Sequence, residues 1–416
     1  MIMSYKIRIY PNKTQINKCL NMFGGCRFVY NQYINYNIRR YENNEKFISW
    51  REYRKIIKDM RNSDYTWLKE LNKHSLDFSV KNANEAFKRF FAGISGFPKF
   101  KSRKSPVQSF YLDSCDKMVI FYNKHVKIPY LGKIRITESH YVPRDRHIMG
   151  LTVKKELDKY YLIFRIPMDN SELDNSKYSN NYKGYGYGID VGIKSFLTIS
   201  DSHYETFQFK SFLNDKKILK LEYKIKYLQQ VISNKMEINY NKLLSEYLKN
   251  HTIEDLTEKY KNIMKGASYS NVCKSLQKKI SKLKKRITNI KNDIINKIVI
   301  KMVKNKPEFI TVETLSIKDM LENDGSTMLH KHIQDSKFYY FFEKLKSKCQ
   351  IYNVQLRFAD KYFASSKKCC ICGHKKKNLK LSDRTYHCSE CGHIVDRDVN
   401  ASINLVDLNK YTVFND

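Results

Sequence analysis

Residues 363–405 read FASSKKCCICGHKKKNLKLSDRTYHCSECGHIVDRDVNASINL, and this stretch decides how the rest of the chain is interpreted. It contains two Cys-x2-Cys pairs separated by 15 residues, namely Cys369 and Cys372, then Cys388 and Cys391. That spacing fits the zinc-ribbon template, in which two tight turns each supply two thiolates to one Zn²⁺ ion. Gly373 and Gly392 follow the two pairs, where such a turn needs a residue without a Cβ. Because four thiolates fill the tetrahedral shell and leave no position for a substrate, we expect a structural zinc.

The remaining cysteines and the N-terminus indicate where the protein works. Half of the ten cysteines crowd into residues 369–391, whereas a secreted disulfide framework is much shorter and spreads its cysteines more evenly. The first residues, MIMSYKIRIYPNK, alternate polar and apolar side chains and lack the apolar core of a signal peptide. We therefore expect a cytoplasmic protein, associated with the nucleoid if the source is prokaryotic.

The net charge indicates the partner. The 416 residues include 77 Lys and Arg against 42 Asp and Glu, which gives a formal charge of +35. Such an excess repels itself unless a polyanion is nearby, so it favours nucleic acid and excludes most enzymes of small neutral metabolites. A hydrophobic content of 42% is too high for a disordered basic tail. No apolar run approaches the roughly 20 residues that a membrane span needs, so we expect no membrane partner.

The chain before the cysteine pairs falls into two patterned halves. Residues 5–10 alternate like a strand, residues 13–104 are mostly helical with an exposed basic loop at 93–105, and residues 107–168 alternate with the period of short strands. We expect these strands to form a small antiparallel barrel that the N-terminal strand joins. The polar segment 169–183 is typical of a linker.

The second half has the order of a mixed α/β domain. Residues 185–209 predict three antiparallel strands, residues 308–317 and 354–360 predict two buried strands, and residues 338–353 predict a helix between them. This order is typical of an RNase H-like nuclease core, although the pattern alone fits several other α/β folds.

A long helical region interrupts that domain. Six aliphatic residues follow one another at intervals of four and three: Leu276, Ile280, Leu283, Ile287, Ile290 and Ile294. This heptad seam predicts two helices paired as an antiparallel arm. Residues 274–304 carry eleven basic side chains and one acidic side chain, a nearly single-signed face that favours contact with nucleic acid over mere solvation.

Carboxylates stand at three places where the sequence around them is apolar or begins a helix. Asp190 ends the strand in YGYGIDVGIK, Glu313 ends the strand in EFITVETLSI, and Asp396 and Asp398 open the helix after the cysteine pairs. Each has a structural explanation as well, since Asp396 could be a helix N-cap and a strand-end Asp can bind a turn amide. Three carboxylates without a strong base suit hard divalent cations, and two such ions about 4 Å apart hydrolyse phosphodiesters.

These motifs together resemble the TnpB family, transposon-encoded RNA-guided DNA nucleases related to type V CRISPR effectors. The resemblance runs nearly end to end: KIRIYPNKTQ…GGCRFVYN at the start, AFKRFFAGISGFPKFKSRKS in the centre, GIDVGIKSFLTIS and ITVETLSIKDM for the first two RuvC motifs, and the stretch 363–405 for the zinc ribbon and the third motif.

The resemblance implies a multidomain α+β fold. It places the first strand of a wedge β-barrel at 1–12, an inserted helical recognition domain at 13–104, the remaining barrel at 105–170 and a linker at 171–183. An RNase H-like RuvC α/β nuclease follows at 184–365 with its helical arm at 213–304, then the zinc ribbon at 366–394 and the RuvC C-terminal helix at 395–416.

The resemblance also implies site roles. Asp190 and Glu313 match the first two catalytic, magnesium-binding positions, and Asp398 matches the third, with Asp396 as the fallback. Arg384 resembles an arginine that acts at the scissile phosphate. The implied cofactors are two Mg²⁺ ions and a structural Zn²⁺.

The implied partners are a guide RNA derived from the transposon end and double-stranded target DNA, whose short flanking motif the protein reads while base pairing reads the rest. There are three alternatives: a compact type V CRISPR effector, which shares every motif, a nuclease-idle RNA-guided repressor, and a transposase that cuts without RNA. The three carboxylates disfavour the second, and no transposase tyrosine motif supports the third. Ser402 stands where an alanine is commoner in the family, a small departure.

Overall fold

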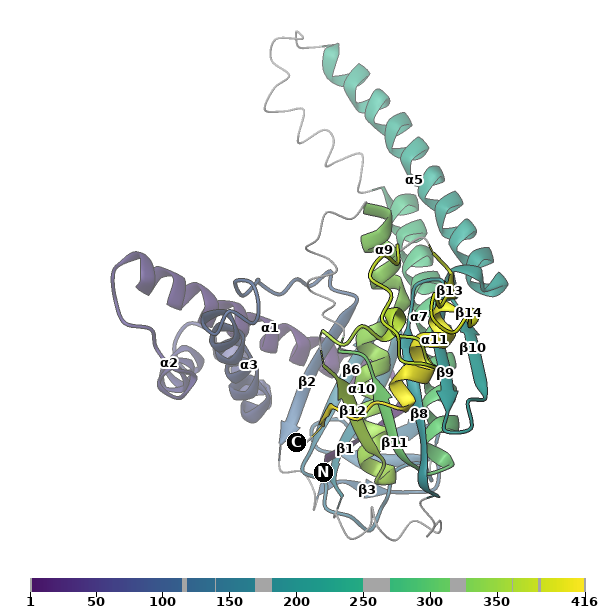
Figure 1. Cartoon of the computed structure of the whole chain (residues 1–416). Coiled ribbons are helices and arrows are strands. Elements are labelled where there is room, and N and C mark those ends of the chain that lie inside the picture. Colours follow the sequence, from purple (N-terminus) through teal and green to yellow (C-terminus); the bar gives the residue numbers. More distant parts are fainter. Residues whose placement is uncertain are drawn as a thin grey trace. The chain divides into compact units, whose positions relative to one another are not determined.

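The computed structural model describes residues 2–113, 118–138, 140–168, 182–249, 270–314, 327–360, 362–380 and 383–414. The chain divides into two compact units, Met1–Asn170 and Ser171–Asp416, whose elements are labelled in Figure 1. Most of the predicted linker 171–183 lies outside the described residues, and strand β8 already begins at Tyr182.

A seven-stranded antiparallel sheet forms the base of the first unit. Its order is β2-β6-β7-β1-β5-β4-β3. The strands are β1 (Ile2–Tyr10), β2 (Val107–Asp113), β3 (Ile120–Phe121), β4 (His125–Ile128), β5 (Gly132–Ile136), β6 (Gly150–Glu156) and β7 (Lys159–Pro167). Strand β1 pairs with β7 on one side and with β5 on the other, so the expectation that the N-terminal strand joins these strands is confirmed. Closure of the sheet into a barrel stays a prediction.

Three helices lie between β1 and β2 in the sequence: α1 (Lys13–Glu42), α2 (Trp50–Asn62) and α3 (Lys73–Phe91), with the short turn η1 (Thr66–Glu70) before α3. Capping boxes start the first two, because Asn12 and Gln15 cap α1 reciprocally and Ser49 and Glu52 do the same for α2. The Gln15 side chain also donates to the backbone oxygens of Leu131 and Lys133 at 3.1 and 2.9 Å, which ties α1 to the sheet.

The second unit contains a six-stranded mixed sheet of order β10-β9-β8-β11-β12-β15. The strands are β8 (Tyr182–Val191), β9 (Ser195–Asp201), β10 (Thr206–Lys210), β11 (Pro307–Val312), β12 (Gln355–Ala359) and β15 (Tyr411–Val413). Strands β8, β9 and β10 are antiparallel and the sheet is mixed, as the sequence pattern predicted; β11 and β12 run parallel to β8.

The predicted C-terminal helix over 395–416 was partly wrong. Helix α11 (Arg397–Val406) ends after ten residues, and β15 then pairs antiparallel with β12 at the sheet edge. A three-residue strand is too short to produce a readable period, so this strand could not be predicted from the sequence. Helix α9 (Thr327–Ser336) was also not predicted.

Long helices accompany this sheet. Helices α5 (Lys216–Leu248) and α7 (Asn271–Lys304) pack along each other, and α10 (Phe338–Tyr352) packs on α7 (Figure 1). Ile280 and Ile287 of the heptad seam are buried in the same apolar cluster as Ile225 and Ile232 of α5, so the predicted helix pair is confirmed. None of the helices in the described ranges contains a stretch long and apolar enough to cross a membrane.

Helix α11 lies directly against strand β8 at Gly188. A Cβ built on Gly188 would overlap the backbone oxygen of Ser402 and lie 2.5 Å from the backbone nitrogen of Val406. The Ser402 hydroxyl in turn hydrogen-bonds the Ser200 hydroxyl of β9 at 2.7 Å. The missing side chain therefore lets the helix backbone approach the strand, and the N-terminal end of α11 reaches the end of β8.

We expect Gly188→Ala to destabilise the second unit, because neither neighbouring backbone atom can move aside without shifting the whole helix. Overpacking of this kind costs about 1–3 kcal/mol, and each kcal/mol lowers the unfolding midpoint of a domain this size by about 2–4 °C. Gly96→Ala is the matched control, since an added Cβ there meets nothing within 4 Å. Thermal unfolding followed by circular dichroism measures both, and equal midpoints for the two variants would refute the contact.

Candidate functional site

The four predicted cysteines converge on one point. The Sγ atoms of Cys369 and Cys391 are 3.7 Å apart, those of Cys372 and Cys388 are 3.5 Å apart, and all four lie within 4.8 Å of one another. A tetrahedral Zn²⁺ with Zn–S bonds of about 2.3 Å separates its sulfurs by about 3.8 Å, so the cluster fits zinc. In the described part of the chain, no other group of His, Cys, Asp or Glu meets this distance limit.

Both turns that carry these cysteines have the predicted conformation. Gly373 and Gly392 adopt φ angles of +76° and +69°, the left-handed region that favours glycine. The backbone N–H of Cys369 donates to the oxygen of His374 at 2.8 Å, and that of Cys388 donates to the oxygen of His393 at 2.9 Å. Neither histidine joins the cysteine group, so four thiolates alone form the candidate shell.

The cysteine-rich segment is attached to helix α11. Its two strands, β13 (Thr385–His387) and β14 (Ile394–Asp396), pair with each other, and β14 leads straight into α11. The Asn400 side chain accepts from the backbone N–H of Cys370 at 3.0 Å and donates to the oxygen of Lys368 at 2.7 Å. The Asn404 side chain donates to the same Lys368 oxygen, also at 2.7 Å. The fold of the ribbon and the position of α11 are thus coupled.

The predicted carboxylates lie on or directly after three elements that contact one another, β8, β11 and α11. Asp190 and Gly188 are two residues apart on β8, so both face the side of the sheet that α11 covers. Parallel pairing of Val312 with Ile189 places Glu313, the next residue, beside Asp190. Asp398 lies in the first turn of α11, where the helix meets this end of the sheet.

The charges of these groups affect one another. Burial and the charges of Glu313 and Asp398 raise the pKa of Asp190 well above its ordinary value. Burial and the charge of Asp398 also raise the pKa of Glu313, against the opposing effects of a hydrogen bond from Ser365 and the charge of Arg397. These side chains repel one another when ionised, and a divalent cation with oxygen ligands would relieve that repulsion. The donor set therefore fits Mg²⁺.

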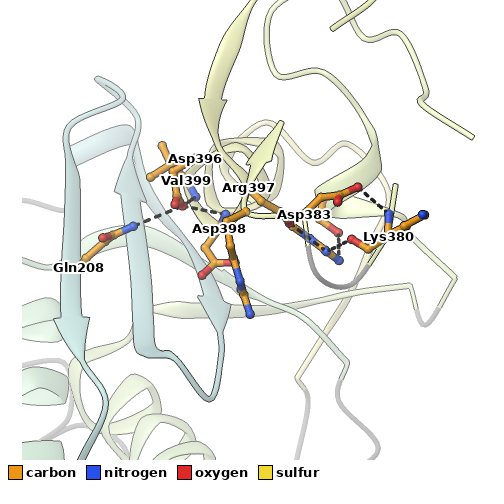
Figure 2. Close-up of polar contacts among 9 residues, drawn as sticks. Gln208, Lys380, Asp383, Asp396, Arg397, Asp398 and Val399 are labelled. Atoms are coloured by element: carbon orange, nitrogen blue, oxygen red, sulfur yellow. Dashed lines mark hydrogen bonds and ion pairs between the residues drawn. The ribbon is translucent and has the colours of Figure 1, made fainter. Parts of the chain in front are cut away.

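The structure distinguishes the two aspartates that open α11. Asp396 is exposed, and its Oδ1 accepts from the backbone N–H groups of Asp398 and Val399 at 2.9 and 3.2 Å, as Figure 2 shows. It is therefore the helix N-cap, the alternative that the sequence left open. The Asp398 side chain is 18% exposed, and burial and the charge of Asp396 raise its pKa. Asp398 is thus the less exposed member of the pair, and its carboxylate is not used as the helix cap.

Two arginines and a lysine border the carboxylates. Arg384 lies in the ribbon with its Nη1 3.7 Å from the Asp398 carboxylate. Arg397 was not predicted from the sequence. Its guanidinium donates a hydrogen bond to the Lys380 oxygen at 2.9 Å (Figure 2). Its positive charge opposes the rise in the pKa of Asp190 and Glu313 that burial causes. Lys194 is exposed in the turn after β8, and its positive charge opposes the rise in the pKa of Asp398 that burial causes. The position of Arg397 between Asp396 and Asp398 is the feature of the sequence that could have indicated its place beside the carboxylates.

Two family models match parts of the chain. A Cas12f1-like TNB domain matches residues 338–405, and a helix-turn-helix domain matches residues 1–46. In the structure, residues 2–42 of the second match form strand β1 and one continuous helix, α1.

Curated relatives cover nearly the whole chain at low identity. Proteins of Streptomyces pristinaespiralis and of Escherichia coli K12 (InsQ), both provisionally named RNA-guided DNA endonucleases, are 23% and 24% identical over 97% of this chain and 88% and 92% of their own length. The TnpB-like protein L79 of Acanthamoeba polyphaga mimivirus is 23% identical over 97% of this chain and 73% of its own length.

We expect the native protein to contain one zinc per chain. Cys388→Ser should lose the metal and lower the unfolding midpoint, because binding of a structural zinc is also folding energy. Cys370→Ser is the matched control, since Cys370 lies between two ligands but outside the four-cysteine group. Elemental analysis of purified protein measures the zinc. Metal-free native protein, or zinc loss in the control alone, would contradict the assignment.

We expect Asp190→Asn to stabilise the protein in buffer without added divalent cations at pH 8. The pKa of Asp190 is higher in the folded protein than in the unfolded chain, where it is about 3.9. Its contribution to stability is therefore complete below pH 3.9 and is lost as the pH rises through the folded-state pKa. The advantage of the Asn variant should therefore shrink towards pH 4.

Added Mg²⁺ should raise the unfolding midpoint of the wild type and leave that of Asp190→Asn unchanged. Asp293→Asn, at an exposed position of α7, controls for the loss of one negative charge. Thermal unfolding across pH 4–8 measures all three proteins. A less stable Asp190→Asn at pH 8, together with an equal response to Mg²⁺, would show that the carboxylates form no cation site.

Proposed function

We propose that this chain, which belongs to the TnpB family, is an RNA-guided DNA endonuclease of a transposon that hydrolyses phosphodiester bonds at a RuvC-type site. The observation that carries the proposal is the convergence of Asp190, Glu313 and Asp398 at one end of the mixed sheet. In a chain of charge +35, three carboxylates on neighbouring elements repel one another, and cation-dependent chemistry on a polyanion explains why they are there.

The fold supports this proposal. Three antiparallel strands followed by two strands parallel to the first is the order of an RNase H-like core, and Asp190 lies on the first of these strands. In this proposal the sheet of the first unit is the wedge barrel, and α1–α3 are the helical recognition domain inserted in it. The cysteine-rich segment is a structural zinc ribbon between β12 and α11.

Each residue of the site then has a chemical role. Asp190, Glu313 and Asp398 hold the cations, and Asp396 fixes the start of α11 by capping it. Two Mg²⁺ ions bound there would activate the attacking water and stabilise the leaving oxygen. Arg384, exposed beside Asp398, binds the scissile phosphate. Arg397 holds the ribbon loop through the Lys380 oxygen and offsets part of the carboxylate charge.

The partners follow from charge and family. A guide RNA derived from the transposon end and a double-stranded DNA target would neutralise the excess of basic side chains, among them the eleven on residues 274–304. The RNA would select the target by base pairing, and the protein would read a short flanking motif in the duplex.

Sequencing of the RNA that copurifies with the protein, followed by a cleavage assay with matching DNA, tests the function. We expect an RNA that spans the transposon end and Mg²⁺-dependent cleavage beside a fixed flanking motif. An RNA transcribed from a CRISPR array would favour the compact type V effector instead, and RNA-directed binding without cleavage would favour the repressor.

Single substitutions test the catalytic assignment. Asp190→Ala and Asp398→Ala should each reduce cleavage by at least about 100-fold, because bound metal supplies several kcal/mol of transition-state stabilisation, while RNA binding persists. Asp396→Ala should lose stability as a missing N-cap does, about 1 kcal/mol, and keep most of its activity. Inactivity of Asp396→Ala alongside an active Asp398→Ala would reverse the assignment of the two aspartates.

A further inference from the structure

A buried threonine on strand β9 has a hydroxyl group without a hydrogen-bond partner. Thr198 is 1% exposed, and its Oγ1 contacts no donor or acceptor within hydrogen-bond distance. Leaving a buried hydroxyl unsatisfied destabilises the folded state, whereas a valine of the same shape would fill the space without that cost. Buried polar atoms without partners are rare in native proteins, and each one calls for an explanation such as a ligand or an ion nearby.

The sheet register places this hydroxyl next to the candidate metal site. Thr198 is the direct antiparallel partner of Asp190. Directly opposed residues extend from the same face of a sheet with Cβ atoms about 4.5–5.5 Å apart, so the hydroxyl is within reach of the carboxylate. The next residue on that face, Ser200, already uses its hydroxyl on Ser402 at 2.7 Å. Among the described residues, Thr198 is therefore a buried donor without a partner that lies opposite the Asp190 carboxylate.

The chemistry of metal-binding carboxylates explains what a hydroxyl group at this position could do. A carboxylate that uses one oxygen on a cation keeps lone pairs on its second oxygen, and a fixed donor there orients the group and tunes its affinity for the ion. A threonine suits this task because its branched Cβ restricts χ1, so the hydroxyl stays where it is placed.

We propose that Thr198 is a positioning residue of the cation site: its hydroxyl donates to one oxygen of the Asp190 carboxylate and turns the other towards the bound divalent cation. The proton stays on the threonine throughout. This inference rests on the proposed function, because it assumes that Asp190 is a metal ligand.

A second threonine supplies a matched control. Thr311 on β11 is 0% exposed and also has an unpartnered hydroxyl, but its register partner across β8 is Gly188 and not Asp190. It shares the strand environment, the burial and the missing partner of Thr198, and differs in lacking a carboxylate opposite. Removing its hydroxyl should therefore affect packing alone.

The test measures Mn²⁺ affinity by electron paramagnetic resonance and, separately, thermal unfolding without added Mn²⁺. We expect Thr198→Val to bind Mn²⁺ about 10–100-fold more weakly, the usual effect of losing a group that orients a metal ligand, with an unfolding midpoint equal to or above that of the wild type. Thr198→Ser keeps the hydroxyl and should restore the affinity. Thr311→Val should leave it unchanged.

The outcomes separate failure of this inference from failure of the proposed function. If Asp190→Asn weakens Mn²⁺ binding and Thr198→Val does not, the role of Thr198 is refuted and the metal site stands. If Thr198→Val lowers affinity and midpoint together, and Thr198→Ser restores neither, the residue acts only through packing and the inference is wrong. If the wild type and Asp190→Asn bind Mn²⁺ equally, the metal site itself fails, and the role of Thr198 fails with it.

Discussion

The contact between the backbone of α11 and strand β8 at Gly188 determines the geometry of the whole site. A helix approaches a strand this closely only where the strand has no side chain, and Gly188 provides that position two residues before Asp190. The approach fixes the distance between the first turn of α11 and the end of β8, and with it the separation of Asp398 from Asp190. The position of Glu313 does not depend on this contact, because the parallel register of β11 on β8 places it beside Asp190.

The cysteine-rich ribbon holds α11 in the position that this contact requires. The ribbon is inserted between β12 and α11, so its fold sets the direction in which α11 begins and therefore the position of Asp398. Four cysteines whose arrangement fits a zinc ion close the insertion, Asn400 and Asn404 bind its first turn to the helix, and Asp396 caps the helix start. A zinc ion bound in the ribbon would thus act on the carboxylates by fixing the position of α11 and not by taking part in the chemistry.

The sequence predicted the parts of this site that have a local signature. The cysteine spacing, the left-handed glycines and the strand-end carboxylates were all readable because spacing and residue type alone define them. The choice between Asp396 and Asp398 rested on the family motif, because a helix cap and a metal ligand are both aspartates in the sequence. Only the hydrogen bonds show that the helix N–H groups donate to Asp396. Arg397, Thr198 and strand β15 were missed because their significance comes from partners far away in the sequence, which periodicity does not encode.

The central claim is that Asp190, Glu313 and Asp398 form one site for divalent cations, and anomalous X-ray diffraction from crystals of the protein soaked in Mn²⁺ tests it most directly. The account predicts anomalous density within coordination distance of carboxylate oxygens from Asp190 and from at least one of the other two residues. Manganese bound elsewhere on the protein, with no density among these three side chains, would contradict it.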